Sequence, residues 1–191
     1  KTQALKILLK AFDLGINSFD TAYAYGDSEE LIGEFIKSKK LYQNAFITSK
    51  LPSISKQDII DEQVSEFVIS RAEESSRRLG IPIANYLVHD FGDYRKYKKQ
   101  IQRASIELKK RKIIKMFGVS LYETEEAEEI MEDKQIDSVQ IPLGIFNQSF
   151  LKNGLLERLK RRDVKIFARS VFNQRLIFLN QERILEKIPA A

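Results

Sequence analysis

Six short apolar segments alternate with helical segments along this chain, and no other feature of the sequence constrains the fold as strongly. Each segment is a nearly continuous run of apolar residues, and the six runs are found at 16–19, 45–48, 85–88, 113–119, 136–140 and 164–168. Strands that face water on one side alternate apolar and polar residues, whereas strands of a parallel sheet are buried on both faces and lack this alternation. The succession of such strands and helices predicts an α/β fold with a parallel sheet.

The helical segments are predicted from apolar residues spaced three and four positions apart. The first contains Leu5, Leu8, Leu9 and Phe12 and ends before Gly15, and the others span 29–36, 58–79, 95–111, 125–133 and 155–161. Acidic clusters fall where these segments begin and basic clusters where they end, as the helix dipole favours. This arrangement accounts for most of the net charge of +5, and aromatic residues are not interleaved with the basic runs as stacking on nucleic acid requires. We therefore expect no nucleic-acid partner.

A polar or ionisable residue stands at the carboxyl end of every predicted strand. These residues are Asp20, Lys50, His89, Ser120, Gln140 and Arg169 with Ser170. An open doubly wound sheet binds its ligand at one switch point, so only one or two of its strand ends need functional groups. A barrel directs all its strand ends toward one mouth. The pattern favours a parallel (β/α)8 TIM barrel, while the alternative that polar residues merely mark where strands stop remains open.

The number of predicted strands is smaller than a closed barrel needs. An eight-stranded barrel takes about 200–250 residues, and these 191 residues open on a helix at Lys1 and offer six strands. One strand before residue 1 and one after residue 191 would complete the ring, which otherwise exposes unpaired strand edges. We expect residues 1–191 to form a single (β/α) barrel domain, apparently incomplete because its first and last strands are not included, within a longer chain.

The composition excludes several classes of site. The sequence has no Cys and one His, which excludes disulfides, thiolate chemistry and the usual multi-histidine zinc centres, so we predict no metal site. Neither a Gly-x-Gly-x-x-Gly motif nor a P-loop occurs, and neither nucleotide site is therefore supported. The apolar runs are too short to span a bilayer, and no secretory leader opens the sequence. We expect a soluble, cytoplasmic protein without a membrane partner.

The most informative stretch is Asp20-Thr21-Ala22-Tyr23-Ala24-Tyr25-Gly26-Asp27-Ser28-Glu29. It resembles the signature of the aldo-keto reductases, in which an Asp-Thr-Ala-x-x-Tyr-Gly-x-Ser-Glu segment follows the second barrel strand. Gly33 falls at the family's next glycine, and the strand ends at Lys50 and His89 fall where the family has its other two catalytic residues. The resemblance covers essentially all 191 residues. It implies an NAD(P)H-dependent reductase that interconverts a small-molecule carbonyl compound and an alcohol.

The chemistry of carbonyl reduction suits the four residues Asp20, Tyr25, Lys50 and His89. The reaction needs a proton donor at the carbonyl oxygen, and a tyrosine hydroxyl is a poor acid unless a nearby cation favours its ionised form. The resemblance implies that Tyr25 is the general acid, Lys50 lowers its pKa, Asp20 positions Lys50, and neutral His89 orients the substrate oxygen. Each also has a purely structural interpretation, as a hydrogen-bonded histidine, a packed tyrosine, a turn cap or a lysine extended along the rim.

Six further residues are implied as cofactor contacts: Ser120, Gln140, Arg169, Ser170, Phe172 and Gln174. The first two would bind the nicotinamide carboxamide, although Leu121 stands where the family often has Asn. Arg169 stands where many members stack a tyrosine on the nicotinamide ring, and a guanidinium can also stack on a flat ring. The last three begin the segment that would cover the pyrophosphate. The resemblance implies NADPH as the cofactor, and NADH is not excluded.

Two other functions stay open at this point. A catalytically idle barrel of this family would hold the cofactor as a regulatory or scaffold subunit, and an aldolase- or isomerase-like barrel would use Lys50 as a Schiff-base amine. We expect the segments 89–94 and 146–148 to line the mouth of the barrel and to tune substrate preference.

Overall fold

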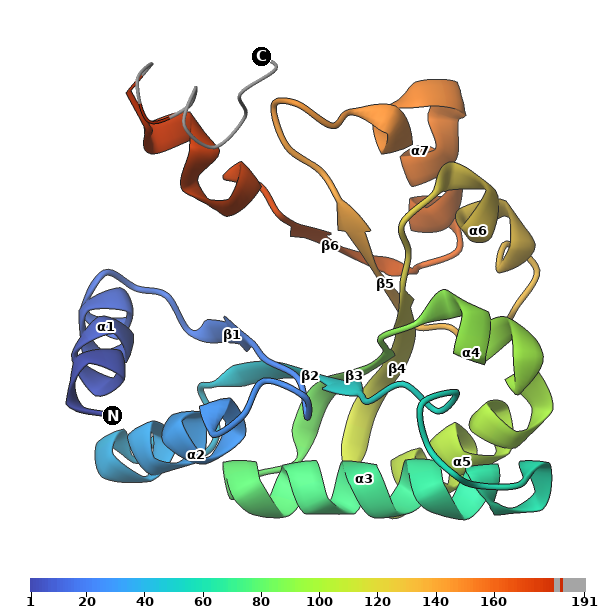
Figure 1. The fold of residues 1–191 in the computed structure, drawn as a ribbon, viewed down its shortest axis with the longest axis horizontal. Helices are drawn as coiled ribbons and strands as arrows, with labels where there is room; N and C mark the ends of the chain where they lie inside the picture. The colour runs from blue at the N-terminus through green and yellow to red at the C-terminus, as the bar shows by residue number, and fades with distance from the viewer. Residues whose placement is uncertain (181–182, 184–191) are drawn as a thin grey trace.

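Figure 1 shows the computed structural model, which describes residues 1–180 and residue 183. Six strands form one sheet, and each strand pairs in parallel with the next strand along the chain. They are β1 (Ser18–Asp20), β2 (Phe46–Leu51), β3 (Ile83–Val88), β4 (Ile114–Ser120), β5 (Ser138–Pro142) and β6 (Lys165–Arg169). The sheet is curled and the helices lie on its outer side. The predicted parallel α/β architecture is confirmed.

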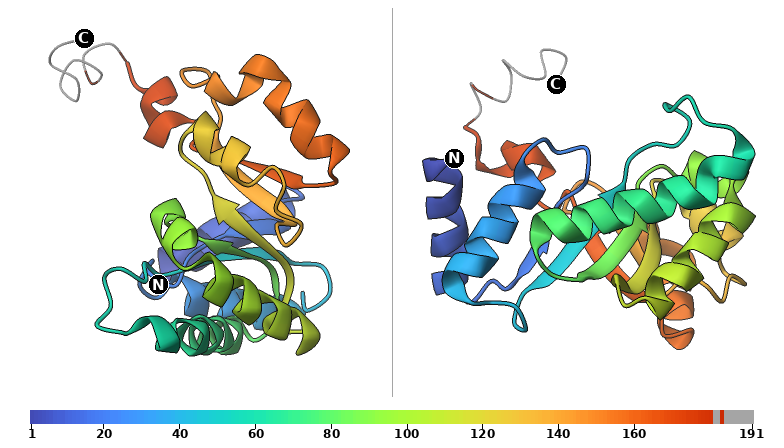
Figure 2. Two further views of the ribbon diagram at one scale, coloured as in Figure 1. Left: turned by 90° about the vertical axis from the view of Figure 1, so that its right-hand side faces the viewer. Right: turned by 90° about the horizontal axis from the view of Figure 1, so that it is seen from below.

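Seven α-helices and three 3-10 helices are found in the described part of the chain. They are α1 (Thr2–Asp13), α2 (Ser28–Lys39), η1 (Asp61–Gln63), α3 (Val64–Leu79), α4 (Phe91–Lys96), α5 (Lys98–Lys110), α6 (Thr124–Glu129), η2 (Ser149–Gly154), α7 (Leu155–Arg161) and η3 (Asn173–Phe178). Helices α1, α2, α3 and α5 lie side by side along the outside of the sheet (Figures 1 and 2). None of the described helices combines the length and the apolar character that crossing a membrane requires.

Helix α3 shows why these segments are helical. Its buried residues recur every three or four positions, at Val64, Val68, Ala72, Ser75 and Leu79. One face of the helix therefore packs inward. The helix ends at Gly80, whose φ of 71° lies in the left-handed region that glycine enters without strain. The predicted start at residue 58 is wrong, because the residues just before Val64 form the short η1 turn instead.

The predicted helix at 95–111 is divided in two. Helix α4 ends at Lys96 and α5 begins at Lys98, and Tyr97 between them leaves helical geometry with φ −112° and ψ 27°. The side chain of Tyr97 is buried in the core, so packing of this ring accompanies the break. The helix predicted at 125–133 is also shorter than expected and ends at Glu129. Local apolar spacing predicted these helices but not their ends.

The sheet curls so strongly that side chains on its inner face contact one another between strands that are not neighbours. Phe46 on β2 and Phe167 on β6 are not on neighbouring strands, yet their rings stack with centroids 5.6 Å apart. Ser138 Oγ on β5 likewise donates a hydrogen bond to Asn85 Oδ1 on β3, at 2.6 Å. Contacts between separated strands across one face require strong curvature. The structure is therefore an incomplete (β/α) barrel rather than an open sheet, as predicted.

Strands β4 and β5 approach each other closely at Gly118. A Cβ atom at this position would lie 2.1 Å from the carbonyl oxygen of Ser138, so only glycine fits here. The same register places Ser120 directly beside Gln140 at the carboxyl ends of the two strands. Strands β1 and β6 form the two edges of the sheet. The described residues thus supply six of the eight strands of a closed barrel.

Candidate active site

The polar residues at the carboxyl ends of the strands all lie at one end of the curled sheet. Asp20, Lys50, Ser120, Gln140 and Arg169 lie within or at the ends of β1, β2, β4, β5 and β6, and His89 directly follows β3. Side chains at every second position of a strand point to the same face. Lys50 and Gln140 both donate hydrogen bonds to Asp20, which connects β1 with β2 and, across the inner face, with β5. The carboxyl ends of the strands therefore form one shared mouth.

Lys50 and Asp20 form the centre of this mouth. Lys50 Nζ donates to Asp20 Oδ1 at 2.7 Å and to the carbonyl oxygen of Thr21 at 2.8 Å. The lysine side chain is only 2% exposed, whereas that of Asp20 is 48% exposed. Burial lowers the pKa of Lys50, and the adjacent Asp20 carboxylate opposes this decrease. The ion pair thus holds a buried ammonium group in one place.

Tyr25 and His89 pack edge to face at the mouth. Their ring centroids are 6.0 Å apart with the planes at 78°, and Lys50 Nζ lies 5.2 Å from the centroid of the Tyr25 ring. Burial lowers the pKa of His89, and the positive charges of Lys50 and Arg169 lower it further. The imidazole is therefore neutral near pH 7 and able to donate a hydrogen bond. The structure brings together all four residues that the sequence predicted as catalytic.

The pKa of Tyr25 differs in direction from the expectation. Burial raises it above its ordinary value of 10.0, the Asp20 carboxylate raises it further, and Arg169 is the cation that opposes the increase. The net effect is a raised pKa of Tyr25, whereas the sequence predicted a lowered value. The physical reason is first the burial of the phenol and then the negative charge of Asp20, which also pairs with the ammonium of Lys50.

Two residues predicted to bind a cofactor carboxamide lie side by side in the mouth. Ser120 is fully buried, and its Oγ has no hydrogen-bond partner among the described residues. Gln140 Nε2 donates to Asp20 Oδ1 at 3.1 Å. A buried hydroxyl without a partner is costly unless a ligand or water satisfies it. This pair therefore fits a ligand that carries a hydrogen-bonding group such as an amide.

One face of the Arg169 guanidinium lies over an aromatic ring of the same chain. Its Cζ lies 4.2 Å from the ring centroid of Tyr122, and its Nη2 donates to the carbonyl oxygen of Leu121 at 3.2 Å. Sequence reasoning missed Tyr122, which lies just after β4 and is 47% exposed. Its position two residues beyond a functional strand end was the one signal that could have identified it. The arginine thus stacks on an aromatic ring of this chain itself.

The remaining predicted cofactor contacts follow β6. Ser170 adopts a left-handed backbone conformation with φ 57°. Phe172 is 56% exposed, and its ring lies 5.4 Å from that of Phe178 in η3. The side chain of Gln174 lies outside the part of the chain that the structure describes. Ser170 and Phe172 directly follow the carboxyl end of β6 in the chain.

A pocket of about 340 Å³ opens beside His89. It is lined by Ser53, Lys56, His89, Asp90, Phe91, Gly92, Tyr122 and Glu126. The loop after β2 forms one wall of this pocket and is held by the buried carboxylate of Asp93, which accepts hydrogen bonds from Ser53 Oγ and from the backbone of Ile54 and Ser55. The predicted segment 89–94 contributes to this lining, whereas the segment 146–148 does not.

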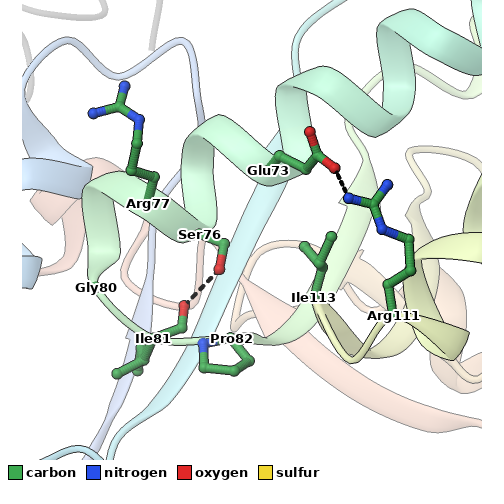
Figure 3. A pocket seen from close by; sticks show the side chains of 8 residues that line it. All are labelled: Glu73, Ser76, Arg77, Gly80, Ile81, Pro82, Arg111 and Ile113. Carbon is green, nitrogen blue, oxygen red and sulfur yellow. Dashed lines mark hydrogen bonds and ion pairs between the residues drawn. The ribbon is translucent and has the colours of Figure 1, made fainter.

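A second pocket, of about 650 Å³, lies away from this site (Figure 3). Its lining includes Gly80, Ile81 and Pro82, which precede β3, and Ile113, which precedes β4. It is therefore at the amino ends of the strands, opposite the mouth. Arg111 and Glu73 form an ion pair across it. In (β/α) barrels this end contributes to stability, while catalysis occurs at the carboxyl ends.

The sequence profile described as "Aldo/keto reductase family" matches residues 1–189. The chain belongs to the aldo/keto reductase family. Its relatives include an aldo-keto reductase of Gibberella moniliformis, which is 26% identical over 168 residues. That alignment covers 87% of this chain and 51% of the relative, so the chain spans about half of the length of this curated aldo-keto reductase.

Solved aldo-keto reductases share the fold. The holo form of an aldo-keto reductase from Bacillus halodurans superposes with a TM-score of 0.73 at 22% identity, covering 92% of this chain and 58% of that one. An aldo/keto reductase from Klebsiella pneumoniae, solved in complex with NADP and acetate, also gives a TM-score of 0.73, at 19% identity. This second likeness covers 99% of the chain and 66% of the Klebsiella protein. Both confirm the barrel architecture of the aldo/keto reductase family.

Proposed function

We propose that this protein is an NAD(P)H-dependent aldo-keto reductase that transfers a hydride to an aldehyde or ketone and forms an alcohol. The observation that carries the proposal is the convergence of Tyr25, Lys50, Asp20 and His89 at one mouth of the barrel. Membership of the family supports the reaction class. The carbonyl oxygen of the substrate would bind where both the Tyr25 hydroxyl and the His89 imidazole can reach it, beside these two packed rings.

In this proposal Tyr25 gives its proton to the carbonyl oxygen as negative charge develops there. His89 is neutral and donates a hydrogen bond to the same oxygen, which orients the carbonyl group. Burial and the Asp20 carboxylate raise the pKa of Tyr25. The positive charges of Lys50 and Arg169 beside the phenol would oppose this increase and stabilise the phenolate that remains after proton transfer. Asp20 holds the ammonium of Lys50 in position through the 2.7 Å ion pair. A bound nicotinamide cofactor would supply the hydride.

The cofactor site is proposed at the ends of β4, β5 and β6. Ser120 and Gln140 would hold the carboxamide, and the buried Ser120 hydroxyl without a partner among the described residues supports this role. Ser170, Phe172 and Gln174 remain proposed contacts for the rest of the cofactor. We propose NADPH, with NADH as the alternative, because the related Klebsiella protein was solved with NADP.

We also propose that residues 1–191 form one barrel domain of a longer protein. The sheet has its edges at β1 and β6, and this chain covers 51% of its Gibberella relative. In such a protein, further strands would pair with these two edges.

The proposal is tested by following NADPH oxidation against a panel of aldehydes in the complete protein, with the variants Tyr25→Phe and Tyr42→Phe. The first removes the proton donor, and we expect kcat to fall by about 10²–10⁴-fold. Tyr42 is a tyrosine that is 51% exposed and outside the mouth, so its variant serves as the matched control and should behave as wild type. Retention of turnover in Tyr25→Phe would refute the proposed role of this tyrosine.

Two further measurements, cofactor titration and borohydride trapping, distinguish the two alternatives. Cofactor binding without turnover of any aldehyde would indicate a catalytically idle barrel that serves as a scaffold or regulatory subunit. Trapping of a carbonyl compound on Lys50 by borohydride would indicate Schiff-base chemistry instead. The hydrogen bonds of Lys50 argue against Schiff-base chemistry, because its ammonium already donates to Asp20 and to the carbonyl of Thr21.

A further inference from the structure

Tyr23, two residues before Tyr25, is fastened to helix α3 on the outer side of the sheet. Its hydroxyl donates a hydrogen bond to Glu74 Oε2 at 3.0 Å and accepts one from Arg71 Nη1. The guanidinium carbons of Arg78 and Arg71 lie 4.5 Å and 5.1 Å from the centroid of its ring. The side chain is therefore held by one carboxylate and two cations, and all three belong to α3.

The backbone of Tyr23 is hydrogen-bonded to Lys50, whose ammonium lies over the Tyr25 ring. The Tyr23 N–H donates to the carbonyl oxygen of Lys50 at 3.2 Å, and Lys50 Nζ donates to the carbonyl oxygen of Thr21. The Tyr25 N–H completes the turn by donating to the carbonyl oxygen of Ala22 at 3.0 Å. One exposed residue separates the fixed Tyr23 from Tyr25.

Within the turn 22–26, Tyr23 is the residue whose side chain makes polar contacts with the helix layer. Ala22, Ala24 and Gly26 have no polar side-chain atoms. The side chain of Tyr25 is 49% exposed and faces Lys50 and His89 in the mouth. The two tyrosines therefore project to opposite sides of one short turn: Tyr23 contacts the helices, and Tyr25 reaches the proposed site of reaction.

We propose that Tyr23 is a positioning residue for Tyr25, and that its hydrogen bond to Glu74 fixes the turn so that the Tyr25 phenol stays beside Lys50 and His89. This inference rests on the proposed function, since it assigns a role to the group that places the proton donor. Proton transfer depends steeply on geometry, and a displacement of about 1 Å lowers a rate by about 10²-fold. Because Tyr25 is half-exposed, the hydrogen bond of Tyr23 to Glu74 would limit the movement of the turn that carries it.

The variant Tyr23→Phe removes the hydroxyl and keeps the ring between the two arginines. Arg71 and Glu74 also pair directly, at 3.0 Å, so we expect the helix layer to retain its charges in the variant. We expect kcat for aldehyde reduction in the complete protein to fall by about 10-fold or more, with KM and the Kd of NADPH unchanged. A residue needed only for folding would lower the amount of active protein, and this also lowers the apparent kcat at unchanged KM. The decrease is therefore expressed per active site, counted by active-site titration, where a purely structural role would leave kcat unchanged.

Two comparisons complete the experiment. In a double-mutant cycle with Glu74→Ala, the double variant should be no slower than Glu74→Ala alone, because both changes break one tie. Tyr42→Phe, the exposed control, should leave kcat unchanged. Additive losses in the cycle, or a kcat of Tyr23→Phe within about twofold of wild type, would overturn the positioning role.

Failure of this inference is distinguishable from failure of the proposed function, because Tyr25→Phe is measured in the same series. Lost turnover in Tyr25→Phe together with normal turnover in Tyr23→Phe refutes only the positioning role. Normal turnover in Tyr25→Phe refutes the proposed function itself, and the positioning role with it.

Discussion

Replacing Asp20 by Asn removes the negative charge that compensates the buried ammonium of Lys50. Breaking a fully buried ion pair by removing one partner costs about 3–5 kcal/mol in the free energy of unfolding. Here the side chain of Asp20 is 48% exposed, and Lys50 keeps its hydrogen bond to the carbonyl of Thr21. Water and this remaining bond reduce the loss, so we expect Asp20→Asn to lower the free energy of unfolding by about 1–2 kcal/mol.

This loss is measured by urea unfolding at pH 7 and by the melting temperature, which should fall by about 2–8 °C for a chain of this size. The matched control is Asp163→Asn, which removes the surface ion pair with Lys165. The side chain of Asp163 is 90% exposed and that of Lys165 56% exposed. A surface pair of this kind contributes less than about 1 kcal/mol, so the control variant should be nearly as stable as wild type.

The effect of Asp20→Asn also depends on pH with a definite sign. Burial lowers the folded-state pKa of Lys50 below 10.5, and Asp20 acts in the opposite direction, so removing Asp20 lowers this pKa further. The unfolded chain then binds more protons than the folded one at alkaline pH, and stability rises with pH in this window. The difference between wild type and Asp20→Asn should therefore shrink as the pH approaches 10.5, where Lys50 is neutral. Two results would refute the stabilising role of the Asp20–Lys50 ion pair. One is a loss in the free energy of unfolding no larger than that of Asp163→Asn, and the other is a loss that grows as the pH becomes alkaline.

Three further predictions follow from the same structure. Because the pKa of His89 is lowered below 6.5, kcat/KM should not decrease between pH 8 and pH 6.5, and a histidine-type decrease in that range would contradict a neutral imidazole. Arg169→Ala removes the cation that opposes the increase in the pKa of Tyr25, so the alkaline limb of the pH profile should move to higher pH; an unchanged limb would show that the charge does not reach the phenol. Gly118→Ala places a methyl group against the backbone of Ser138 and should destabilise the barrel by about 1–3 kcal/mol in urea unfolding, whereas a neutral result would mean that β4 and β5 are less closely packed than described.

Much of the fold could be predicted from the sequence, because the relevant signals are local. Six continuous apolar runs and the helical spacing between them predicted the six parallel strands, and the polar residues at the strand ends predicted a barrel mouth rather than a single switch point. The helix boundaries were less predictable. The break at Tyr97 accompanies burial of its ring, and the η1 turn replaces the first residues of the predicted helix at 58–79.

The sequence by itself determined which residues stand at the carboxyl ends of the strands. The reason is that the succession of apolar strand segments and helical segments, and with it the parallel pairing, follows from the order of residues alone. Only the tertiary structure decided what those residues contact. It distinguishes Tyr25, which faces the mouth, from Tyr23, which is bound to α3, and it stacks Arg169 on Tyr122. It also reverses the expected direction of the pKa of Tyr25. The physical reason is that burial and charge at one phenol depend on groups that lie far apart in the sequence and meet only when the sheet curls.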